Sequence, residues 1–189
     1  FPEKDGLANV GLGFARDEMT KEYIGMGLED LLNHWIENSP LAEPIRRGKR
    51  VGEFKGWRIP NALGAVGNCS DGIMLIGDAA SMVEPFTGEG VAHGILAAKI
   101  AAWTAGRALN ANDASLAVLK EYSEIYDSMT REDVLKLGEM KEKAFRGIDA
   151  CNAAVRAFRD VPEMGQSMIA VPRYIEQLNE ILKDKEARI

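Results

Sequence analysis

An acidic residue at the end of an apolar run is the feature of the sequence best suited to binding chemistry. Asp78 follows Gly77 directly, and both come after the short apolar run Ile73 to Ile76. Such a run predicts a strand buried on both faces. Ligands of open α/β sheets bind beyond the carboxyl ends of the strands, where a carboxylate can accept hydrogen bonds from sugar or sugar-alcohol hydroxyls. Asp78 is therefore the first candidate binding residue.

A glycine-rich segment a few residues later offers backbone groups to the same ligand. It comprises Pro85, Phe86, Thr87, Gly88, Glu89 and Gly90, and a helix is predicted to begin at its end. The first amide N–H groups of a helix have no partner within it, and its N-terminus carries roughly half a positive charge. Since glycines carry no side chain, this segment can lay bare backbone against a flat or anionic ligand. Each half of the pattern alone is also typical of an ordinary turn or helix cap.

Other residues with chemical potential have simpler interpretations. The basic run Arg46 to Arg50 could attract a diphosphate or a phospholipid head group, but it is more typical of a solvated loop. His93 has no visible partner in the sequence, so a packing role is its default interpretation. Trp57 is the tryptophan best placed for a pocket role, although tryptophans more often belong to a core. No Ser/His/Asp or metal-ligand constellation stands out.

The elements that must position these residues fall into three stretches. In residues 1–70, alternating apolar residues predict strands at Leu7 to Phe14 and at Lys49 to Ile59. Between them, helical spacing predicts a helix from Thr20 to Asn38, which Pro40 ends. In the first strand, Gly11 and Gly13 weaken the strand unless something approaches the backbone closely.

The other two stretches are expected to be simpler. Residues 71–109 form a strand, a loop and a helix from Gly88 to Leu109 that is rich in small residues. Residues 110–189 are expected to be helical, with helices at Ala114 to Met129, Thr130 to Phe158 and Tyr174 to Lys185. The predicted fold class is therefore α+β.

Composition narrows the class of protein. The 189 residues are 46% hydrophobic and 28% charged, which is typical of a globular protein. The net charge of −6 argues against nucleic-acid binding. Cys69 and Cys151 match no metal or redox spacing and fit a reduced, cytoplasmic setting. The longest apolar stretch, Val91 to Trp103, is shorter than the ~20 residues of a bilayer span, so only peripheral membrane contact stays open.

The continuous string from Gly77 to Val91 is more specific than its parts. It reads GDAASMVEPFTGEGV and resembles the second FAD motif of the flavoproteins related to para-hydroxybenzoate hydroxylase. In that superfamily the aspartate holds the ribityl part of FAD, and the following loop and helix start face the isoalloxazine ring. The resemblance implies FAD as cofactor, bound by Gly77, by Asp78 and by Pro85 through Gly90.

Within that superfamily the sequence looks most like the geranylgeranyl reductase family. Phe1-Pro2 matches the end of that family's substrate-site motif, and Ala8 to Gly13 resembles the strand that follows it. Gly56 to Pro60 resembles the segment leading toward the flavin motif. The resemblance covers roughly Phe1 to Arg107. The substrate-site residues that we predict on this basis are Phe1, Pro2, Gly11, Gly13 and Trp57, with the face of Gly11 and Gly13 lining a substrate tunnel.

The resemblance implies an FAD-dependent oxidoreductase that reduces C=C bonds of isoprenoid (geranylgeranyl) chains in lipids or prenyl compounds. The reductant, NAD(P)H or ferredoxin, is not determined. Two alternatives stay open. A flavin monooxygenase or halogenase shares the Gly-Asp motif, and a non-catalytic helical interaction module could be built on a decayed flavin fold. Intact Asp78 and Gly88-Glu89-Gly90 argue against decay.

The other FAD motif of the superfamily, a Gly-x-Gly-x-x-Gly on a strand–turn–helix, is absent from these residues, and the first residue is Phe1. We therefore expect a C-terminal fragment of a two-domain, Rossmann-like flavoprotein. Residues 1–70 would end its substrate-binding domain, 71–109 would form the FAD strand–loop–helix, and 110–189 would form the helical C-terminal region. The fragment alone is expected to be inactive, with the strand Ile73 to Ile76 exposing an apolar edge.

Overall fold

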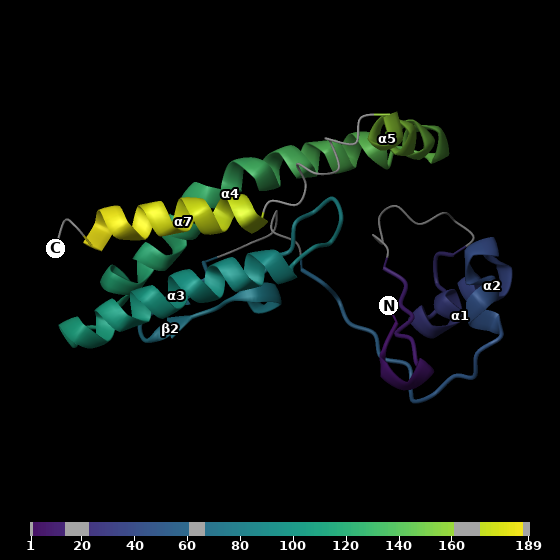
Figure 1. The fold of residues 1–189 in the computed structure, drawn as a ribbon, viewed down its shortest axis with the longest axis horizontal. Coiled ribbons are helices and arrows are strands. Elements are labelled where there is room, and N and C mark those ends of the chain that lie inside the picture. The colour runs from purple at the N-terminus through teal and green to yellow at the C-terminus, as the bar shows by residue number, and fades with distance from the viewer. Residues whose placement is uncertain (1, 14–22, 61–66, 161–170, 187–189) are drawn as a thin grey trace. The chain divides into compact units, whose positions relative to one another are not determined.

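The computed structural model describes residues 2–13, 23–60, 67–160 and 171–186 (Figure 1). The chain divides into two compact units, Phe1–Arg58 and Ile59–Ile189. The described residues are mostly helical, with one two-stranded sheet. Among them, no helix is both long enough and apolar enough to cross a membrane. The divisions expected after residues 70 and 109 stay predictions.

The first unit is built from short helices. After the 3₁₀ turn η1 (Lys4–Gly6) come α1 (Leu28–Asn38), η3 (Pro40–Ala42) and α2 (Glu43–Arg46). The predicted strands at 7–14 and 49–59 are wrong over the part of them that is described. In the described part of these two segments, the only strand-like pairing is an isolated bridge between Pro2 and Ala8. The predicted strands have no neighbouring strand to which their backbone groups could bond.

Helix α1 ends where it was predicted to end but begins later. Ser39 donates its backbone N–H to the carbonyl of Trp35, and Pro40 then starts the separate turn η3. At the other end, the residues before Leu28 form a turn in which Gly25 has a φ of 100°, a left-handed conformation that would interrupt a helix. Residues 20–22 of the predicted helix lie outside the described residues.

The second unit is a layer of helices over a small sheet. Helices α3 (Val91–Ala111), α4 (Leu116–Ala144) and α7 (Val171–Glu186) pack on one another, and β1 (Cys69–Ser70) lies against α4 (Figure 1). β1 pairs antiparallel with β2 (Ile73–Met74). The core where these elements meet consists of Ala80, Met82, Leu96, Ala97, Ile100, Tyr122, Ile125, Tyr126, Tyr174 and Leu178.

The helical region confirms the prediction in kind but corrects one boundary. Helix α4 runs through Thr130, which was expected to cap a new helix. Thr130 is buried and its hydroxyl donates to the carbonyl of Tyr126 within the same helix, at 2.9 Å, so it caps nothing. The chain turns instead at Gly147, where φ is 139°, and α5 (Ile148–Asp160) follows. Helix α7 covers the predicted helix at Tyr174 to Lys185.

The predicted strand–loop–helix is present in the expected order, but its strand is shorter. Pairing covers only Ile73 and Met74, and in the described residues β2 has β1 as its one neighbour. Ile73 is 56% exposed, and Leu75 and Ile76 are exposed as well. The expectation that this run is buried on both faces is therefore wrong for this chain, whereas the expected exposure of its apolar edge is observed.

Candidate functional site

The turn that follows β2 places Asp78 beside the start of α3. The 3₁₀ turn η5 (Gly77–Ala80) lies against α3 and closes through a hydrogen bond of 3.1 Å from Met82 N to the Gly77 carbonyl. Gly77 has a φ of 61°, which favours glycine. A Cβ added to Gly90 would lie 3.2 Å from the Asp78 carboxylate, so these two residues nearly touch. Three residues that were predicted to bind the cofactor, Gly77, Asp78 and Gly90, are thus brought together.

The Asp78 carboxylate is exposed and available. Within the described part of the chain, it has no hydrogen-bond or ion-pair partner. The turn that carries it is closed by backbone hydrogen bonds and not by this side chain. The side chain is therefore free to accept hydrogen bonds from an external donor such as a hydroxyl group.

A buried carboxylate that sequence reasoning missed holds the loop in shape. Glu84 is only 5% exposed, and its carboxylate accepts hydrogen bonds from the backbone N–H of Phe86 at 2.8 Å and from both the N–H and the hydroxyl of Thr87. The Glu84 backbone adds a bond from its N–H to the carbonyl of Glu89, at 2.9 Å. The loop is therefore organised before any ligand binds. The signal in the sequence was an acidic residue directly before Pro85 in an otherwise apolar stretch.

The start of α3 is less open than the sequence suggested. The Glu89 carboxylate accepts a hydrogen bond of 2.7 Å from the backbone N–H of Ala92, so a carboxylate of the chain itself already caps one of the free amides. Gly88 has a φ of 77° and open space where a side chain would be. Thr87, Gly88 and Glu89 are exposed, Phe86 is half-buried and Pro85 is buried. The surface left for a flat ligand is therefore the exposed Thr87-Gly88-Glu89 backbone.

His93, in the first turn of α3, has the packing role that was expected from the sequence. It is buried, and its Nδ1 lies 2.8 Å from the hydroxyl of Tyr126 on α4. Its ring also lies 5.9 Å from that of Tyr174 on α7, whose hydroxyl donates to Asp133. Burial lowers the pKa of His93, and the negative charges of Glu89, Glu84 and Asp133 only partly oppose that effect. The histidine ties three helices together directly behind the loop.

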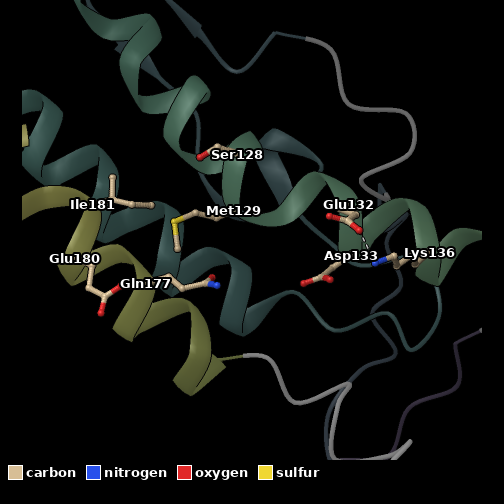
Figure 2. A pocket seen from close by; sticks show the side chains of 8 residues that line it. All are labelled: Ser128, Met129, Glu132, Asp133, Lys136, Gln177, Glu180 and Ile181. Atoms are coloured by element: carbon tan, nitrogen blue, oxygen red, sulfur yellow. Dashed lines mark hydrogen bonds and ion pairs between the residues drawn. The ribbon is translucent and has the colours of Figure 1, made fainter. Parts of the chain in front are cut away.

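A polar groove of about 470 Å³ runs between α4 and α7 (Figure 2). Its lining residues are Ser128, Met129, Glu132, Asp133, Lys136, Gln177, Glu180 and Ile181. Several of its charged groups already bind one another or the core. Lys136 donates to Glu132 at 2.5 Å, and Asp133 accepts from Tyr174. The bond between Tyr174 and Asp133 therefore joins α7 to α4 beside the groove, whereas the Lys136–Glu132 pair lies within α4.

The three arginines of the basic run in the first unit bind groups of that same unit. The Arg46 guanidinium donates to the carbonyls of Ile36 and Ser39 at 2.7 and 3.0 Å, which caps the end of α1. Arg47 pairs with Glu43, and Arg50 with Glu29. The interpretation as a phosphate site loses its support, because these three arginines are engaged within their own unit.

The predicted substrate residues all belong to the first unit. Trp57 is 92% exposed, and Pro2 lies in the isolated bridge. Gly11 and Gly13 are exposed, and no atom lies within 4 Å of where their Cβ atoms would be. Phe1 lies outside the described residues. The open space at the two glycines leaves room for a ligand, but their substrate role stays a prediction.

Comparison with known proteins shows the family to which this chain belongs. No protein-family model matches the chain. The chain is 30% identical over 165 residues to digeranylgeranylglycerophospholipid reductase 1 of Methanothermobacter thermautotrophicus. The aligned region covers 85% of this chain and 38% of the relative. The chain is 27% identical over 184 residues to digeranylgeranylglycerophospholipid reductase 2 of Methanococcoides burtonii, which covers 96% of this chain and 43% of that relative. The chain belongs to the geranylgeranyl reductase family.

A solved structure agrees with this assignment at the level of the fold. The crystal structure of a geranylgeranyl bacteriochlorophyll reductase-like protein from Thermoplasma acidophilum matches with a TM-score of 0.65 and 23% identity. The match covers 95% of this chain and 46% of the other. This geranylgeranyl reductase family chain thus spans less than half the length of the relatives it matches.

Proposed function

We propose that this chain forms one wall of the FAD site of an enzyme that reduces C=C bonds in isoprenoid chains of lipids. The observation that carries the proposal is the free, exposed Asp78 carboxylate in contact distance of Gly90, beside a loop that Glu84 holds in shape. The names of the relatives, digeranylgeranylglycerophospholipid reductases, support an isoprenoid phospholipid as the substrate class.

The residues present suit a cofactor with hydroxyl groups and a flat ring. Asp78 would accept hydrogen bonds from ribityl hydroxyls, and a Cβ at position 90 would lie 3.2 Å from that carboxylate, so the glycine keeps the space beside it open. The exposed backbone at Gly88, with its φ of 77°, would lie against the ring. Glu84 would keep this backbone from collapsing onto the site. When bound, reduced FAD would supply a hydride to one carbon of the C=C bond, and a proton would complete the other.

The exposed apolar edge supports a larger binding domain. Ile73, Leu75 and Ile76 are exposed in a run whose composition is typical of a strand covered on both faces. We propose that further strands of a dinucleotide-binding domain, with the other FAD motif, cover this edge and provide the rest of the cofactor site. The activity therefore belongs to the complete protein, and the electron donor, NAD(P)H or ferredoxin, acts there.

The alternatives are less well supported. A flavin monooxygenase or halogenase would use the same Gly-Asp turn, but the relatives are named reductases. A non-catalytic helical module would not need the free carboxylate of Asp78. Peripheral membrane contact remains part of the proposal, because the substrate is a lipid and α5 exposes the apolar side chains of Ile148 and Val155.

Spectroscopy of the complete protein tests the proposal. We expect the purified protein to carry a visible flavin absorption band that disappears on reduction. Addition of a digeranylgeranyl phospholipid without oxygen should restore the band while the lipid gains two hydrogens for each C=C bond reduced. Oxygen uptake coupled to a hydroxylated product would favour the monooxygenase instead, and a protein that never binds flavin would favour the interaction module.

A further inference from the structure

An apolar groove in the second unit begins at the candidate flavin loop. It has a volume of about 390 Å³ and lies between the end of α4 and α5. Phe86 of the loop, Met140 and Lys143 of α4, and alanines of α5 including Ala150, Ala154 and Ala157 line it. The volume is at the lower end of the range of about 300–1,000 Å³ for small-molecule sites.

Phe86 links the groove to the candidate cofactor site. It lies between Pro85 and Thr87 in the loop that Glu84 organises, and its backbone N–H donates to that carboxylate. Its ring lies 5.7 Å from the ring of Phe145, at the end of α4. One end of the groove is therefore made by a residue of the loop that the proposed function places against the flavin ring.

The chemistry of the lining fits a branched hydrocarbon chain. The alanines at 150, 154 and 157 recur at helical spacing, so their methyl groups form one shallow wall of α5. Small side chains leave width for the methyl branch that each isoprene unit carries, whereas leucine or phenylalanine would fill that space. A site of this kind binds by burying apolar surface and offers no hydrogen-bonding pattern for a sugar or a peptide.

Lys143 supplies the single charge of the lining. It is exposed at the rim, and within the described residues its ammonium group has no partner. An ammonium group at the mouth of an apolar groove complements a phosphate that is attached to an apolar chain. This combination favours a phospholipid over a neutral prenyl alcohol, and it commits the groove to one kind of occupant.

We propose that this groove holds part of an isoprenoid chain of the phospholipid substrate, with Lys143 facing its phosphate group. This inference rests on the proposed function and adds to it the substrate-binding surface of the second unit. It differs from the predicted tunnel at Gly11 and Gly13, which belong to the first unit.

Substitutions that fill the groove test it in the complete protein with flavin bound. Ala154→Phe should weaken binding of digeranylgeranylglycerophosphate by at least about tenfold, because the ring displaces several methylene groups from the groove. Asn152→Phe is the matched control, since it adds the same ring at an exposed position of α5 that does not line the groove. Its affinity for the lipid should equal that of the wild type.

The charge is tested separately. Lys143→Gln should weaken phospholipid binding by about fivefold, as expected for an exposed ion pair, and Lys143→Arg should restore it. Geranylgeraniol, which has no phosphate, should bind the wild type and Lys143→Gln equally. Inorganic phosphate alone should not compete, because the site needs the apolar chain. Equal phospholipid affinity in Lys143→Gln would overturn the role of Lys143, and competition by phosphate alone would overturn the requirement for the apolar chain.

Photolabelling of the wild-type protein keeps the proposal open to refutation even if a variant does not fold. A geranylgeranyl phospholipid with a diazirine near the chain end should label peptides that contain Met140 or residues 150–157. Flavin absorbance and lipid turnover are measured in parallel. Labels elsewhere with normal turnover would overturn the groove and leave the proposed function intact. A protein that binds no isoprenoid lipid at all would overturn both.

Discussion

Removal of the Glu84 carboxylate should loosen the candidate flavin loop without unfolding the helices around it. Glu84→Ala deletes three hydrogen bonds, two of which come from neighbouring backbone amides of Phe86 and Thr87. Hydrogen bonds to a charged group contribute about 1.5–3 kcal/mol each. Those on one carboxylate do not add fully, because water can replace the carboxylate at exposed Thr87.

We therefore expect the free energy of opening this segment to fall by about 3 kcal/mol, which corresponds to a roughly hundredfold increase in amide exchange. Glu84→Gln is the matched control. It keeps one oxygen acceptor for Thr87 but places an amide donor against the N–H of Phe86, so it should lose only about half as much. The expected order of exchange rates is wild type, then glutamine, then alanine.

Hydrogen exchange with residue resolution measures the effect at Phe86 and Thr87. Amides of Leu96 and Leu178, in the core of α3 and α7, report on global unfolding and should exchange as in the wild type. Unchanged exchange at Phe86 and Thr87 in Glu84→Ala would refute the reasoning, since the loop would then hold its shape without the carboxylate.

Three further predictions concern the same unit. In the complete protein, Asp78→Ala should lower FAD affinity by about ten- to a hundredfold in titrations of the apoprotein, because one charge-assisted hydrogen bond is lost. Burial holds the pKa of His93 below its ordinary 6.5, so the unfolded chain binds the proton first as pH falls. The free energy of unfolding should therefore decrease below about pH 6.5 in urea titrations, and His93→Gln should reduce that slope. Tyr122→Phe should lower the free energy of unfolding by about 1–3 kcal/mol, since the buried Tyr122 hydroxyl donates to the Leu75 carbonyl at 2.6 Å. Equal thermal stability of this variant and the wild type would contradict that bond's importance.

Local sequence signals predicted the parts that local interactions determine. Pro40 stops α1, and the small-residue helix after Gly90 forms as α3, because both depend on residues close in sequence. The resemblance assigned Asp78 and Gly90 to one cofactor but did not predict that they approach each other. In the structure the Asp78 carboxylate lies 3.2 Å from where a Cβ of Gly90 would be.

Features that depend on partners distant in sequence were missed. Residues 49–59 alternate like a strand, but the described chain gives them no neighbour with which to pair. Thr130 is a residue type that often caps helices, but here it is buried in the core and α4 continues past it. The burial of His93 depends on Tyr126 and Tyr174, from two other helices, which no local pattern could indicate.

Anaerobic single-turnover kinetics of the complete protein test the central claim most directly. The flavin is reduced and mixed with a digeranylgeranyl phospholipid, and its absorbance is followed while the lipid is analysed by mass. We predict reoxidation of the flavin in step with the gain of two hydrogens for each C=C bond reduced, and weak flavin retention in Asp78→Ala. Lipid reduction by a flavin-free preparation, or reduced flavin that stays reduced with the lipid bound, would contradict the account.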